Sequence, residues 1–86
     1  MKTRTIVITA ANGLHARPAG ELVNMIKGLE SRVTLRTEAR EAEARSILSI
    51  LSLGLKCGTA VTVTAEGPDE ERAAEQVAAF LERAHE

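Results

Sequence analysis

The spacing of apolar and polar residues predicts four strands. Residues 3–9 (TRTIVIT) are rich in β-branched residues, and residues 31–37 (SRVTLRT) and 59–65 (TAVTVTA) alternate apolar with polar positions. Both patterns are typical of strands, and the alternation indicates that one face of the strand meets water. Residues 40–44 (REAEA) alternate more weakly, which predicts an edge strand but fits a helix equally well.

Three further stretches have the spacing of helices. Residues 16–27 place apolar side chains three and four apart. Residues 46–54 (SILSILSLG) form a short apolar run, with Ser46 ahead as an N-cap and Gly54 behind as a C-cap. From Pro68, which suits the first position of a helix, a helical pattern continues to the end. The inward stripe of this last helix is predicted to be Ala73, Val77, Phe80, Leu81 and Ala84.

The predicted order is therefore β-α-β-β-α-β-α. Strands with one wet face and helices with one apolar stripe predict an α+β fold of two layers, an antiparallel sheet with helices on one side. We expect residues 1–86 to form one domain, because a chain of this length has no room for a second.

Composition excludes several classes of protein. Phe80 is the one aromatic residue, and 11 basic residues stand against 12 acidic ones, so we expect no nucleic acid partner. The single Cys57 leaves no internal disulfide and no cysteine-based metal site, and a free thiol fits a reducing compartment. The apolar run at residues 6–8 is too short for a signal peptide, and no stretch is long enough to insert into a membrane. We expect a cytoplasmic protein.

The segment NGLHARPAG (12–20) carries the candidate chemistry. His15 directly precedes a predicted helix, where free N–H groups and the helix dipole favour an anion. Arg17 adds a guanidinium fork suited to phosphate oxygens, and neutral imidazole is a competent nucleophile. A lone histidine in a loop is more often a solvated or capping residue. A metal site is less favoured, because the only other histidine, His85, lies in the C-terminal tail.

Two segments, NGLHARPAG and ARSILSILSLGLKCG (44–58), resemble the signature segments of HPr, the histidine-containing phosphocarrier family of the bacterial phosphoenolpyruvate:sugar phosphotransferase system. The resemblance covers nearly the whole chain in length, element order and motif spacing. It implies an open-faced β-sandwich, in which three helices cover one face of a four-stranded antiparallel sheet. It also implies a phosphocarrier rather than a free-standing enzyme, and no metal or organic cofactor for the transfer.

The resemblance assigns roles to individual residues. His15 would accept a phosphoryl group on Nδ1 from phosphorylated Enzyme I and pass it to Enzyme IIA proteins, while Arg17 would steady the phosphoryl oxygens. Ser46 matches a regulatory serine that an ATP-dependent HPr kinase/phosphorylase modifies, although a helix N-cap alone explains a serine there. Ile47, Leu48 and Leu51 would dock Enzyme I and the IIA proteins, and Gly20 and Val23 on the preceding helix are weaker candidates.

Three departures from the family pattern leave partner pairing open. Ser49 stands where glycine is frequent, Arg45 where lysine is usual, and Cys57 where glutamine is familiar. Two alternatives remain: a regulatory module read through phosphorylated Ser46 by a catabolite-control regulator, and a nitrogen-related phosphotransfer branch. His15 argues against the HPr-like regulator that lacks the active histidine. We expect a monomer with an unobstructed docking face. A hydrolase is nearly excluded, since only one catalytic candidate is present.

Overall fold

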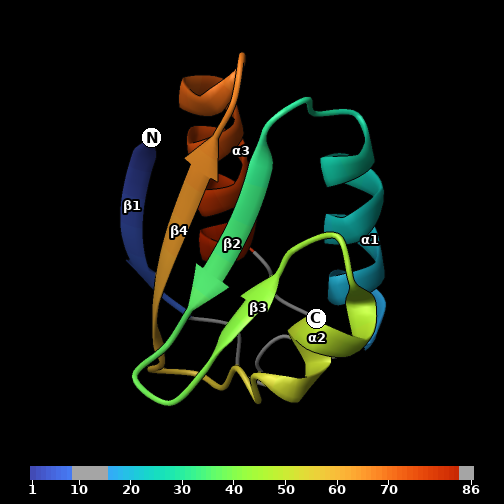
Figure 1. Cartoon of the computed structure of the whole chain (residues 1–86). Coiled ribbons are helices and arrows are strands. Elements are labelled where there is room, and N and C mark those ends of the chain that lie inside the picture. The colour runs from blue at the N-terminus through green and yellow to red at the C-terminus, as the bar shows by residue number, and fades with distance from the viewer. Residues whose placement is uncertain (9–15, 84–86) are drawn as a thin grey trace.

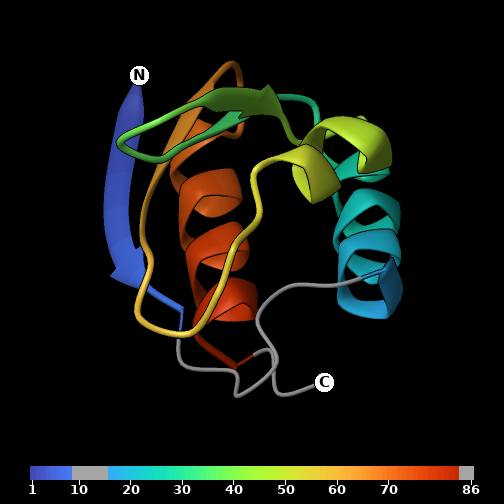
Figure 2. The ribbon, with the colours of Figure 1, turned by 90° about the horizontal axis from the view of Figure 1, so that it is seen from below.

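The protein forms two layers, a four-stranded antiparallel sheet and three helices on one of its faces (Figures 1 and 2). A computed structural model describes residues 1–8 and 16–83. The predicted element order and open-faced sandwich are confirmed. The elements are β1 (Lys2–Val7), α1 (Ala16–Lys27), β2 (Arg32–Arg36), β3 (Glu41–Glu43), α2 (Ile47–Ser52), β4 (Ala60–Glu66) and α3 (Glu70–Arg83).

The sheet has the order β1-β4-β2-β3, so the last strand in the chain lies at its centre. On β4, Val61, Val63 and Ala65 are buried against the helices, while the alternating Thr62 and Thr64 point to the open face. β3 is only three residues long and pairs with β2, which confirms the edge strand at 40–44 and decides against the helical alternative there. The alternating pattern thus places the whole helical layer on one side.

The core between the layers is aliphatic, as the composition requires. Leu22 and Ile26 of α1 and Leu35 of β2 are fully buried, and each such side chain stabilises the fold by about 1.5–3 kcal/mol. From the predicted stripe of α3, Ala73, Val77 and Leu81 are buried and Phe80 is half-buried against the core. Ala84 lies outside the described residues.

The start of α3 differs from the prediction. The sequence predicts Pro68 at the first helical position, but the helix begins at Glu70. Its first backbone hydrogen bond runs from Ala73 N to Asp69 O, at 2.8 Å. Glu70 Oε1 in turn accepts from Gly67 N at 3.2 Å. The N-terminal end of α3 is therefore set by the hydrogen bonds of Asp69 and Gly67 and not by Pro68.

Asp69 joins two turns that are distant in sequence. Its carboxylate accepts from Glu30 N at 3.0 Å and from Ser31 Oγ, and both donors lie in the turn between α1 and β2. Gly67 lies so close to the backbone of Ser31 that a Cβ on residue 67 would approach Ser31 Cα to 2.7 Å. The hydrogen bond from Ser31, followed by that from Glu30 N, lowers the pKa of Asp69 below its ordinary value.

We expect Asp69→Asn to lower the melting temperature by several degrees at neutral pH, because the amide replaces one acceptor with a donor facing Glu30 N–H. The pKa of Asp69 is lower in the folded than in the unfolded chain, so its stabilisation is present above the ordinary carboxyl pKa and is lost as pH falls through the folded value. Thermal unfolding from about pH 7 down to about pH 2 should show the two proteins converging in acid. The exposed Glu38→Gln is the control; a constant gap at all pH values would contradict the assignment.

Candidate functional site

The candidate site lies where α1 and α2 meet on the helical layer (Figure 1). Gly20 of α1 faces Ile47 of α2, and a Cβ on Gly20 would lie 3.7 Å from Ile47 Cδ1. The N-terminal half of α1 is therefore brought beside the apolar surface of α2. These are two of the three sequence regions that carry the predicted site.

The third region is the histidine itself. His15 falls in residues 9–15, outside the described residues, and the side chain of Arg17 is outside them as well. Their predicted roles therefore stay predictions. α1 starts immediately after His15, at Ala16, and its first turn carries no acidic residue, so no side-chain carboxylate there competes for the free N–H groups.

Ile8, which follows β1, is hydrogen-bonded to the loop before β4. Ile8 N donates to Thr59 O at 2.9 Å, and Gly58 N donates to Ile8 O at 2.7 Å. Cys57, one of the departures from the family pattern, is exposed in this same loop. This loop therefore holds Ile8, the last described residue before α1.

Ser46 caps α2 as predicted. Its backbone is extended, with φ −108° and ψ 112°, and its Oγ accepts from Ser49 N at 3.3 Å. At the other end the C-cap is Leu53, one residue before the predicted Gly54. Gly54 follows with φ +63°, the left-handed conformation that glycine adopts without strain. The serine therefore has a structural role, with or without a regulatory one.

Three apolar residues of α2, Ile47, Leu48 and Leu51, form an exposed surface that we term the α2 patch. Leu48 is 76% exposed, and Ile47 and Leu51 are 36% and 37% exposed. Ile50 points the other way and is fully buried. A six-residue helix has one face toward the core, so four apolar residues in ILSILS leave several of them in water.

The α1 candidates contribute less exposed surface. Gly20 and Val23 are both half-buried, and Val23 packs against the core. Gly20 faces Ile47, and a Cβ added there would lie at ordinary contact distance from that side chain. Two basic residues near α2, Arg40 and Arg45, were not among the candidates, and their contacts described below involve backbone carbonyls that no sequence pattern marks.

The described residues contain no helix long and apolar enough to cross a membrane. Within the same part of the chain, no group of three or more His, Cys, Asp and Glu side chains is arranged to hold a metal ion. The one described ionisable cluster with lowered pKa values, Asp69 and Glu70, lies at the start of α3 and contacts the turn after α1 rather than the start of α1. It is separate from the candidate site.

The fold is that of a small open-faced sandwich, and its exposed apolar patch is a feature that often marks a protein-interaction surface. Comparison with known proteins gives the family. The profile described as "PTS HPr component phosphorylation site" matches residues 2–83. The chain belongs to this family, the HPr phosphocarriers of the phosphotransferase system, as the signature segments predicted.

Individual relatives agree over nearly the full length. The phosphocarrier protein HPr of Vibrio cholerae is 38% identical over 85 residues, which is 99% of this chain and 100% of that protein. The crystal structure of HPr-C-His from Thermoanaerobacter tengcongensis has a TM-score of 0.89 at 38% identity, covering 95% of this chain and 92% of that one. Both carry the same family name and support the general phosphocarrier role.

Solved relatives also include dimers. Crh of Bacillus subtilis, a catabolite repression protein that forms a swapped dimer, has a TM-score of 0.78 at 32% identity and covers 100% of this chain and 99% of its own. The HPr of Thermoanaerobacter tengcongensis has also been solved as a dimer. An unobstructed docking face does not decide the oligomeric state, so the expected monomer stays a prediction.

Proposed function

We propose that His15 accepts a phosphoryl group from phosphorylated Enzyme I and passes it to Enzyme IIA proteins in the cytoplasm. The observation that carries the proposal is the start of α1 directly after His15, with no acid in its first turn, beside the exposed α2 patch. A reactive group and a protein-docking surface at one end of the molecule are what a carrier needs.

The proposed step is an exchange of one bond to phosphorus for another. Nδ1 of His15 attacks the phosphorus, a nitrogen–phosphorus bond forms, and the bond to the donor group of Enzyme I breaks. Arg17 would hold the phosphoryl oxygens, and the free N–H groups of α1 would add about 0.3–1 kcal/mol of stabilisation. A modest value suits a carrier, since tight binding of the phosphoryl group would slow the second transfer.

The α2 patch would be the part that Enzyme I and the IIA proteins contact. The stretch 44–65 contains no acid, and its Lys56 is exposed after the end of α2, where its charge would face a partner. A partner surface that is apolar at its centre and acidic at its rim would complement this stretch, and opposite charges would speed association. Docking at α2 would bring the partner to the start of α1.

The proposal is tested by incubating the protein with phosphoenolpyruvate and its cognate Enzyme I and measuring the intact mass. We expect one added phosphoryl group that is lost in acid and kept in alkali, as a phosphoramidate is. Subsequent addition of a IIA protein should return the mass to its original value. A chain that takes up no phosphoryl group from the cognate enzyme would contradict the proposal.

We further propose that phosphorylation of Ser46 by an HPr kinase/phosphorylase weakens docking without refolding the protein. The phosphate would sit at the start of α2, which tolerates negative charge, but next to the α2 patch. It could also create the surface that a catabolite-control regulator reads.

We expect Ser46→Asp to raise the KM for Enzyme I about tenfold with little change in kcat, because the carboxylate must be desolvated against an acidic partner. Steady-state transfer kinetics measure this effect. Ser46→Ala is the matched control: it removes the cap at a cost of about 1 kcal/mol of stability but adds no charge, so its KM should stay near that of the unmodified protein. Equal KM values for both variants would contradict the mechanism.

A further inference from the structure

The helix that carries the α2 patch, α2, is too short to be stable without contacts to the rest of the protein. With six residues, α2 is well below the length at which a helix is stable in water. Ile50 anchors its inner face in the core and Ser46 caps its start. Beyond this packing, contacts at the two ends of α2 help to set its orientation.

The C-terminal end of α2 has a partner for each of its last four carbonyls. Ser49 O accepts from Ser52 Oγ at 2.7 Å, and the carbonyls of Ile50 and Leu51 accept from Leu53 N and Gly54 N at 3.1 and 3.2 Å. These donors all belong to α2 or to the two residues after it. The last carbonyl, Ser52 O, accepts from Arg40 Nη1 at 3.4 Å, and Arg40 comes from the β2–β3 hairpin.

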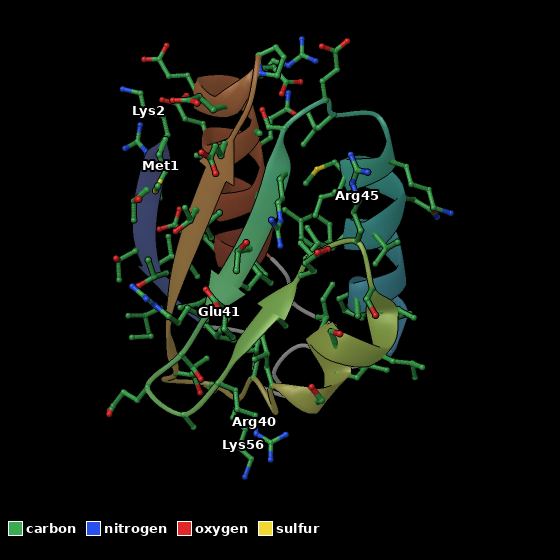
Figure 3. All side chains as sticks on the ribbon, in the orientation of Figure 1. Met1, Lys2, Arg40, Glu41, Arg45 and Lys56 are labelled. Carbon is green, nitrogen blue, oxygen red and sulfur yellow. The ribbon has the colours of Figure 1, made fainter. Side chains whose placement is uncertain are left out.

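The N-terminal end of α2 is tied to a different element. Arg45, directly before the cap residue Ser46, donates from Nη2 to Leu29 O at 3.4 Å. Leu29 follows α1 and is buried. Figure 3 shows Arg45 beside α1, while Arg40 lies at the hairpin near α2. The two guanidinium groups thus connect α2 to the hairpin at one end and to the turn after α1 at the other.

We propose that Arg40 and Arg45 are positioning residues that hold the α2 patch in the orientation required for docking. The inference rests on the proposed docking role of α2 and extends it to two residues that need not touch the partner. A charged donor at each end restricts rotation of the short helix about the buried Ile50. Without these donors, Leu48 and Leu51 would sample several positions, and each docking event would have to select one of them.

The test compares Arg40→Gln, Arg45→Gln and the double variant with Arg36→Gln, all in the full chain. Arg36 is an exposed arginine of β2 and controls for the loss of one positive charge. Amide hydrogen exchange is measured on α2 and on β4, and KM and kcat are measured for phosphoryl transfer from Enzyme I. The exchange measurement needs no partner, so it reports on positioning even if the proposed function fails.

We expect exchange of the α2 amides to accelerate about threefold in each single variant and about tenfold in the double variant, with β4 unchanged. The KM should rise by similar factors at constant kcat, and Arg36→Gln should match the unmodified protein. Equal acceleration in β4 would indicate global destabilisation and overturn the proposal. A raised KM with unchanged α2 exchange would also overturn it, because the arginines would then act as partner-contacting charges.

Discussion

Replacing His15 by Ala will abolish phosphoryl uptake from Enzyme I, with transfer falling at least about a thousandfold. His15 is the one imidazole in the segment 12–20, and the guanidinium of the neighbouring Arg17 is a hydrogen-bond donor rather than a nucleophile. The measurement is the intact mass after incubation with phosphoenolpyruvate and Enzyme I, combined with the rate of transfer to a IIA protein. The variant should keep the melting temperature of the unmodified protein within about a degree or two.

The second histidine of the chain provides the control. His85→Ala removes the same imidazole from the C-terminal tail and should leave both the mass change and the transfer rate unaltered. An acid-labile phosphoryl group on His15→Ala would contradict the assignment, and its absence from His85→Ala would move the acceptor to the tail. Either result would refute His15 as the accepting residue but leave the family assignment intact, because that assignment rests on the whole sequence.

Local signals in the sequence were sufficient for most of the fold. A serine directly ahead of a short apolar run predicts the N-cap at Ser46, and the structure confirms it with a local hydrogen bond between residues three apart. The alternation in 59–65 located the central strand to within a residue. The predicted start of α3 was wrong, because Asp69 is held by Glu30 and Ser31, which come close to it only in the folded chain.

In the site, too, local features could be predicted and contacts between distant residues could not. The excess of apolar residues in α2 predicted that some would stay exposed, and the resemblance to HPr selected Ile47, Leu48 and Leu51, which the structure places in water. The ties from Arg40 to Ser52 O and from Arg45 to Leu29 O could not be predicted, since any arginine can reach some carbonyl. The sequence marks Arg45 only as a departure from the lysine that is usual at this position in the family.

Leu48→Asp will raise the KM for Enzyme I about a hundredfold while leaving kcat nearly unchanged. Leu48 is the most exposed member of the α2 patch, at 76%, so its side chain contributes little to the core. The few hot-spot residues near the centre of a docking surface each carry about 2 kcal/mol or more of binding energy, and a charge introduced there must also be desolvated. The loss therefore appears in association with the partner and not in the transfer step.

Folding and docking effects can be separated because Leu48 is exposed. An aspartate inside a helix costs at most about 0.7 kcal/mol in propensity, so thermal unfolding of Leu48→Asp should change little. Gln76→Asp introduces the same charge on the exposed side of α3, and its KM should equal that of the unmodified protein. Because α3 lies outside the α2 patch, a similar rise in KM for both variants would indicate long-range repulsion. A rise confined to Leu48→Asp would locate the partner on α2, beside the N-terminal half of α1.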